Sequence, residues 1–90
     1  MQARFSSDQV SCKGASSEYV RTADSGNPIT FHFCPECGST MYYRLGDTPE
    51  MIAIPVGAFA DPEFPPPAFS VYEARQHAWV GLPDNIEHFD

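Results

Sequence analysis

The sequence predicts a mainly β domain, and three observations support that prediction. Short runs rich in β-branched and aromatic residues recur along the 90 residues, with turn-forming residues between them. No segment sustains the apolar period of a capped helix. The turn Cys34–Gly38, with the sequence C-P-E-C-G, lies between two of the β-rich runs, which is the arrangement of a zinc knuckle.

The first elements are an amino-terminal strand and a hairpin. A strand is expected near Ala3–Val10. Glu18–Thr22 and Ile29–Phe33 are β-rich, and Ala23–Pro28 between them contains Asp, Ser, Gly and Asn, which are turn formers. These two runs therefore predict a hairpin that leads directly into the cysteine turn.

Three more strands are expected after the cysteines, at Ser39–Leu45, Met51–Gly57 and Phe69–Glu73. Pro55 lies inside the second of these runs, and proline has no N–H to donate to a ladder. We therefore expect Met51–Gly57 to be an edge strand or to be bulged at the proline.

Two segments have alternative interpretations. Ala60–Ala68 is proline-rich and extended, as a ligand of a proline-recognising domain would be, but a crossover loop laid over the sheet and pinned by Phe59 and Phe64 needs no partner. We favour the loop. Glu73–Trp79 is the best helical candidate, although so short a segment is equally consistent with a loop.

Charge and length limit the classes of function. The net charge is −7, and residues 45–90 carry eight acidic groups against the single basic Arg75, so we expect no nucleic-acid partner. No apolar run approaches the length of a membrane span, and no secretory signal is visible. Three cysteines, an odd number, fit the reducing cytoplasm. A single domain over 1–90 is small enough that a metal, a partner chain or a missing segment is expected to stabilise it.

The cysteine pair predicts half of a metal site. Cys34 and Cys37 are spaced as two ligands of a tetrahedral zinc, which needs four. A redox C-x-x-C is the competing interpretation, but that motif begins a helix, and Gly-Ser-Thr-Met-Tyr-Tyr after Cys37 is poor in helix formers. The remaining candidate ligands have no matching spacing: Cys12, His32, His77 and His88.

Three segments together resemble a known family. His32–Arg44, Ile54–Pro62 and Val71–Trp79 look like the carboxy-terminal two-thirds of the glutathione-dependent formaldehyde-activating enzymes, a family that includes centromere protein V. The resemblance implies a Mss4-like fold of folded antiparallel sheets with zinc at the knuckle. It also implies carbon–sulfur lyase chemistry, the reversible condensation of formaldehyde with glutathione to S-hydroxymethylglutathione.

The chain departs from this family in its cysteines. Family members carry an upstream C-x-C pair that completes the structural zinc and a C-x-C-x-x-C cluster that holds a catalytic zinc, and neither motif occurs in this sequence. Only Cys34 and Cys37 are carried over, as structural zinc ligands; the catalytic and substrate-binding residues stay unassigned. We therefore expect an amino-terminally truncated domain that is inactive alone. The alternative is a non-catalytic module, such as a homodimer that shares one Cys₄ zinc between chains.

Overall fold

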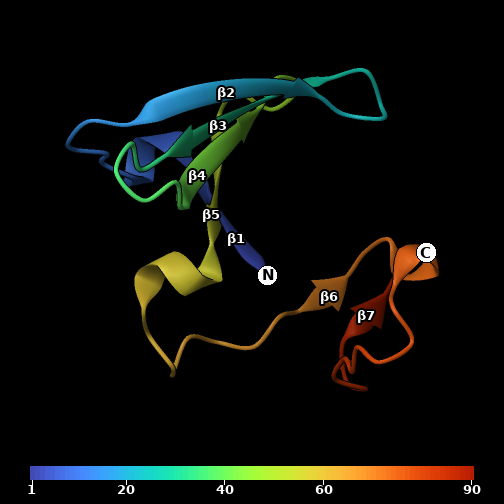
Figure 1. Cartoon of the computed structure of the whole chain (residues 1–90). Helices are drawn as coiled ribbons and strands as arrows, with labels where there is room; N and C mark the ends of the chain where they lie inside the picture. Colours follow the sequence, from blue (N-terminus) through green and yellow to red (C-terminus); the bar gives the residue numbers. More distant parts are fainter.

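The structure is a computed structural model that describes residues 1–90. Five strands form one antiparallel sheet in the order β1-β5-β4-β3-β2, and a two-stranded pair, β6-β7, lies apart from it (Figure 1). No α-helix is present, and none of the helical turns is long and apolar enough to cross a membrane. The mainly β fold predicted from the sequence is confirmed. The strands are β1 Gln2–Ser6, β2 Ser17–Thr22, β3 Pro28–Phe33, β4 Thr40–Leu45, β5 Met51–Pro55, β6 Phe69–Ser70 and β7 Glu87–His88, and the 3-10 turns are η1 Ser7–Gln9, η2 Val56–Phe59 and η3 Glu73–Arg75.

The predicted hairpin is present as β2 and β3. Its register pairs Ser17 with Phe33 at one end and Thr22 with Pro28 at the other. The turn is closed by the Ala23 N–H, which donates to the carbonyl of Asn27 at 2.9 Å. β4 then pairs antiparallel with β3, so the cysteine turn connects two neighbouring strands, as expected from the sequence.

The expectation for Pro55 was wrong. β5 is an inner strand between β1 and β4, and it pairs with β1 without a register shift. Pro55 is its last residue, opposite Gln2. A proline at the very end of a strand removes no interior ladder hydrogen bond, because the chain leaves the sheet there into η2.

The carboxy-terminal elements are shorter than predicted. β6 stops at Ser70, and Tyr72 has a left-handed backbone with φ 58°, which cannot continue a strand. The 3-10 turn Glu73–Arg75 replaces the helical candidate that extended to Trp79. β6 pairs in parallel with β7, a partner that the sequence analysis did not identify, because a two-residue strand has too little pattern to recognise.

The loop after β5 is held by aromatic contacts. The rings of Phe59 and Phe64 stack with centroids 5.0 Å apart, and Phe59 also meets Phe5 of β1 edge to face at 6.1 Å. These contacts agree with the expectation that Phe59 and Phe64 pin the proline-rich segment, but the segment runs away from the sheet and is not laid over it (Figure 1). That segment leads from the sheet to the separate β6-β7 pair (Figure 1).

The strand register gives the sheet two distinct faces. Side chains alternate along each strand, and directly paired residues point the same way. Face A carries Arg4, Arg21, Ile29, Tyr43 and Ala53, and face B carries Phe5, Val20, His32, Tyr42 and Ile52. Apolar residues occur on both faces, so neither is a purely solvent-facing surface.

The core is small. Only Ile29, Ile52 and Ala53 are buried, with 8%, 1% and 3% of their surface exposed. Two of the three belong to the inner strand β5, which contributes Ile52 to face B and Ala53 to face A. β5 therefore links the packing on the two sides of the sheet.

Truncating the most buried side chain should destabilise the fold strongly. We expect Ile52→Ala to lower the free energy of unfolding by about 2–5 kcal/mol, because it removes buried methyl groups and leaves a cavity that β5 cannot collapse. Urea unfolding followed by circular dichroism measures the change. Val20→Ala, at a site 58% exposed on the same face, is the matched control and should change stability by about 0.5 kcal/mol or less. Equal losses in the two variants would contradict this assignment of the core.

Gly46 should resist any added side chain. Its N–H donates to the carbonyl of Pro28 at 2.8 Å, and a Cβ placed on it would lie 2.6 Å from Cγ of the Pro28 ring. We expect Gly46→Ala to cost about 1–3 kcal/mol of stability, because the rigid ring cannot move aside. Gly57→Ala, where a Cβ would meet nothing within 4 Å, is the control and should be nearly neutral in the same unfolding experiment.

Candidate functional site

The cysteine turn is held by backbone hydrogen bonds. The Gly38 N–H donates to the carbonyl of Cys34 at 2.8 Å, and the Cys34 N–H donates to the carbonyl of Ser39 at 2.9 Å. Gly38 has φ 80°, a conformation that favours glycine because other residues meet a steric penalty there. The turn follows an irregularity in the β3–β4 register between His32 and Phe33. The chain therefore closes tightly with both cysteines on one turn.

The environment of Cys37 favours its thiolate. The pKa of Cys37 is lowered, first by the Ser39 hydroxyl, whose oxygen lies 3.4 Å from the sulfur, and then by the Ser39 backbone and the Cys34 thiol. A hydroxyl and a backbone N–H can both donate to a thiolate, whereas they gain less from a neutral thiol. The thiolate is the form that binds metal, so the donor chemistry of Cys34 and Cys37 fits two ligands of a zinc ion.

The other candidate ligands lie in different contacts. His32 stacks on Tyr42 with ring centroids 4.3 Å apart, and its Nδ1 lies 3.4 Å from the Ser16 hydroxyl. Cys12 is exposed on the loop between η1 and β2. No group of three or more His, Cys, Asp or Glu side chains is placed to hold one metal ion. The structure therefore places no third candidate ligand beside Cys34 and Cys37.

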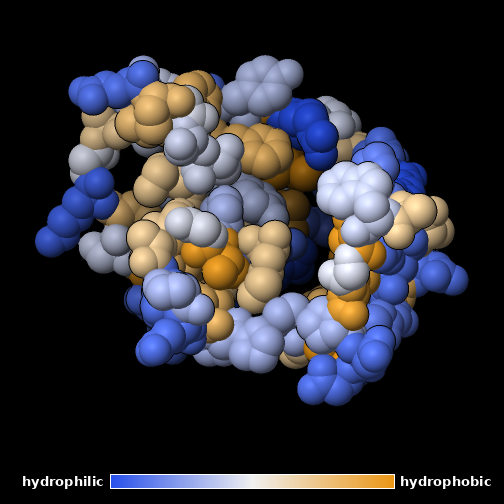
Figure 2. Space-filling model, turned by 60° about the horizontal axis from the view of Figure 1, so that its bottom comes forward, coloured by the Kyte–Doolittle hydropathy of each residue, from blue (hydrophilic) through white to orange (hydrophobic).

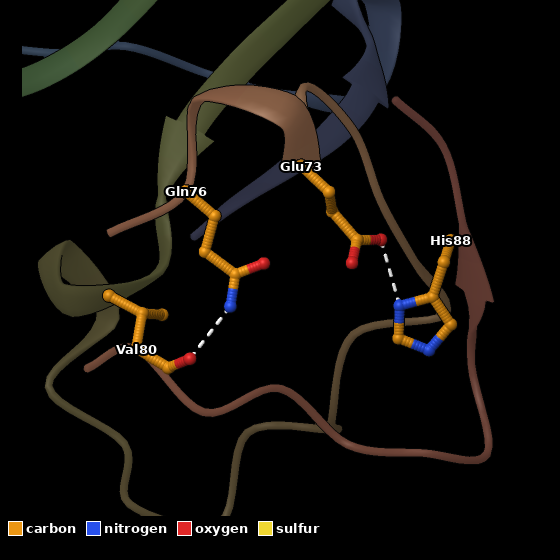
Figure 3. A network of polar contacts seen from close by, with 4 residues as sticks. All are labelled: Glu73, Gln76, Val80 and His88. Carbon is orange, nitrogen blue, oxygen red and sulfur yellow. Dashed lines mark hydrogen bonds and ion pairs between the residues drawn. The ribbon is translucent and has the colours of Figure 1, made fainter. Parts of the chain in front are cut away.

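Two histidines belong to the carboxy-terminal segment. The His77 ring stacks on Trp79 at 5.5 Å, and His88 Nδ1 lies 2.8 Å from a carboxylate oxygen of Glu73. In Figure 3 the Glu73 and His88 side chains point toward each other from η3 and β7. The Glu73 N–H also donates to the carbonyl of Phe89 at 3.1 Å. This double contact fixes η3 against the end of the chain.

A second polar contact closes the loop after η3. The Gln76 side-chain amide donates to the carbonyl of Val80 at 2.7 Å (Figure 3). The Val80 N–H in turn donates to the carbonyl of His77 at 3.0 Å. Residues 76–80 thus form a compact turn beside η3, although most of their side chains are exposed.

Face B carries a small, largely apolar pocket of about 290 Å³. Ile52, Ile54 and Phe59 form its apolar wall, and the 10–16 loop with Cys12 closes it. Tyr42 also lines it, and the pKa of its hydroxyl is raised, mainly by burial and secondarily by the charge that Cys12 would carry. The sequence analysis placed Cys12 in no site, because nothing in the local pattern indicates that its loop folds back over β4 and β5.

Face A carries a larger and more polar cleft of about 570 Å³. Arg4 and Arg21 reach it from the two outermost strands of the sheet, and Arg75 reaches it from η3. Tyr43 lies between them on β4. Sequence reasoning missed this cleft, because its basic residues are far apart in the chain and form no motif.

The surface between the two parts of the molecule is hollowed. Figure 2 shows apolar residues on both sides of a deep hollow, with hydrophilic residues at its bottom. Large apolar side chains are exposed in the carboxy-terminal segment, among them Tyr72 at 68% and Trp79 at 82%.

Ionisation of the Tyr43 hydroxyl makes the free energy of unfolding depend on pH. Burial raises the pKa of its hydroxyl, and the positive charge of Arg4 opposes that shift. A tyrosine whose pKa in the folded state lies above the unfolded value of about 10 contributes its full stabilisation below about pH 10. That stabilisation is lost as the pH rises through the folded-state pKa. Stability should therefore fall in alkaline solution for this reason.

We expect Tyr43→Phe to reduce that alkaline loss. The free energy of unfolding, measured in urea between about pH 8.5 and 11, should decline less in this variant than in the wild type, because no phenol remains to titrate at the site. Tyr19→Phe, at a side chain 62% exposed, is the control and should follow the wild-type slope. Identical slopes for all three proteins would rule out a contribution from Tyr43.

Comparison with known proteins gives one match. A family model described as glutathione-dependent formaldehyde-activating enzyme matches residues 1–75. No curated protein and no solved structure matches the chain. The matched residues contain the whole five-stranded sheet, the cysteine turn and the arginines of face A. The match covers most of the chain, including the five-stranded sheet and the cysteine pair, so this chain belongs to the glutathione-dependent formaldehyde-activating enzyme family.

Proposed function

We propose that residues 1–90 supply the scaffold and two structural zinc ligands, Cys34 and Cys37, of a carbon–sulfur lyase of this family. The reaction is the condensation of formaldehyde with the thiol of glutathione to form S-hydroxymethylglutathione. The family match supports this reaction class, and the closed turn with its lowered Cys37 pKa supports zinc binding. The cysteine turn is the single observation on which the proposal depends.

The role of the chain's own residues is structural at this turn. Gly38 permits the backbone to fold back, and the N–H of Cys34 anchors the turn to Ser39. Ser39 stabilises the thiolate of Cys37 and so prepares it as a ligand. A zinc ion bound by four thiolates would cross-link the turn and contribute to the stability of a domain whose core has three buried residues.

The catalytic step requires thiolates that these 90 residues do not contain. In such an enzyme a second zinc with an open position supplies a Lewis acid that activates the thiol and the formaldehyde carbonyl. The only cysteine here besides the pair is Cys12, which lies on the loop over face B. We therefore propose that residues 1–90 alone do not catalyse the condensation of formaldehyde with glutathione. The free thiols also support a cytoplasmic location for the protein.

A second candidate function is a non-catalytic homodimer that shares one zinc. Cys37 and the residues around it, 35–41, are exposed, so a second copy can approach the turn without displacing other parts of the chain. Two identical pairs related by a two-fold axis make one closed Cys₄ site. Glutathione adducts are not a required ligand in this alternative.

Zinc binding should depend on the pair and not on the third cysteine. We expect Cys34→Ser and Cys37→Ser each to abolish stoichiometric zinc uptake, because the remaining single thiolate cannot close a tetrahedral site. Cys12→Ser is the matched control and should bind zinc as the wild type does. Metal analysis combined with native mass spectrometry measures both uptake and assembly.

The stoichiometry separates the two candidate functions. One zinc per two chains supports the shared site, and one zinc per chain requires further ligands from within the chain, for which Cys12 and the three histidines are the candidates. Absence of zinc in the wild type would overturn the zinc proposal for residues 1–90. Turnover of formaldehyde and glutathione by these residues alone would contradict the proposal that they lack a catalytic centre.

A further inference from the structure

The cleft on face A concentrates positive charge in an acidic chain. The sequence has five basic side chains against twelve acidic ones, and three of the five, Arg4, Arg21 and Arg75, line this one cleft. In a protein with a net charge of −7, such a concentration is not expected from composition alone. Asp24 and Asp47 also line the cleft, so three arginines less two aspartates leave a formal charge of +1 there, against −7 for the whole chain.

Two of these arginines have no carboxylate partner. Arg75 pairs with Asp24 at 3.2 Å, and the Asp47 carboxylate accepts a hydrogen bond from the Asn27 amide at 3.2 Å. No carboxylate lies within 4.0 Å of the guanidinium groups of Arg4 and Arg21. Arg21 instead lies over the Phe31 ring at 5.9 Å. Their donors are therefore free to bind a ligand.

The two free arginines approach the cleft from opposite sides. β1 and β2 are the two edges of the sheet, and in a flat sheet four strand spacings of about 4.8 Å would separate them. The sheet is strongly twisted, with β1 and β5 crossing beneath β3 and β4 (Figure 1), so Arg4 and Arg21 line the same concave surface. A ligand that contacts both must carry acceptors at two separated points.

The surface between the arginines is suited to an apolar spacer. Ile29 and Leu45 line the cleft, and Tyr43 and Tyr72 add aromatic rings. Thr48 also lines the cleft, but its Oγ1 is buried within the protein and does not face the open space.

We propose that the cleft on face A is a binding site for a small organic dianion that carries an acid group at each end of a short apolar chain. The two acid groups accept hydrogen bonds from the guanidinium groups of Arg4 and Arg21. The cleft volume of about 570 Å³ lies in the usual range for small-molecule sites. Arg75, held to Asp24, closes the carboxy-terminal side of the cleft.

This site is separate from the cysteine turn. The cleft lies toward the Pro28 end of β3 and the turn follows the Phe33 end, and no residue from Thr30 to Tyr42 lines the cleft. Recognition requires no thiol and no metal. The anion-binding proposal can therefore be tested separately from zinc binding at Cys34 and Cys37.

The test uses dicarboxylic acids of increasing length as a molecular ruler. Malonate, succinate, glutarate and adipate are titrated into the 90-residue protein, with binding followed by backbone amide shifts in NMR spectra. An ionic strength of about 0.15 M limits long-range repulsion from the acidic surface, because screening then acts over about 8 Å. One length should bind best, at least about tenfold tighter than acetate or inorganic phosphate, and should shift the amides of Arg4, Tyr43 and Thr48.

Matched variants assign the contacts. Arg4→Gln and Arg21→Gln should each weaken binding by about tenfold or more, since each removes a charge-assisted hydrogen-bonding pair. Lys13→Gln makes the same change in net charge on the loop over face B and should leave affinity unchanged.

Three results would overturn the proposal. The first is no preference for a dicarboxylate over acetate or phosphate. The second is equal weakening by Lys13→Gln and Arg4→Gln, which would indicate general charge attraction. The third is a ligand-induced shift centred on Gly38 and Ser39, which would place the ligand at the cysteine turn.

Discussion

The antiparallel pairing of β3 with β4 is the interaction on which both candidate sites depend. At one end of this ladder the Cys34 N–H donates to the Ser39 carbonyl and closes the cysteine turn. At the other end the Gly46 N–H donates to the Pro28 carbonyl, next in sequence to residues that line the cleft on face A. A slip of one residue would exchange the two faces of β4. Tyr43 would then leave the cleft and Tyr42 would leave His32, so one register sets both environments.

The thin core explains why external ligands matter to this domain. Three buried residues give little hydrophobic stabilisation, and the ion pair between Arg75 and Asp24 is exposed on both sides, where such pairs contribute about 0–1 kcal/mol. A metal at the cysteine turn, or an anion between Arg4 and Arg21, would bind only the folded state and so stabilise it. The cysteine pair without further metal ligands, and Arg4 and Arg21 without carboxylate partners, are therefore also the places where a ligand would stabilise the fold.

Local patterns were sufficient for much of the fold. The hairpin of β2 and β3 follows from two β-rich runs around a Gly-Asn turn, and the left-handed Gly38 follows from the C-P-E-C-G motif. Local patterns failed at Pro55, because strand order is not a property of one strand, and at Tyr72, where the backbone conformation ends β6 early. The two-residue strand β7 is specified by its partner and not by its own residues.

The mainly β class and the position of the cysteine pair follow from residues that are close together in the chain, and the family resemblance follows from three such local segments. Which residues share a face of the sheet depends on strand order and twist, which exist only in the folded chain. Arg4, Arg21 and Arg75 form a cleft because strand order and twist bring them together, and Cys12 meets Tyr42 because its loop folds over face B. Long-range pairing has no local signature, and for that reason the cysteine turn was visible in the sequence while the arginine cleft was not.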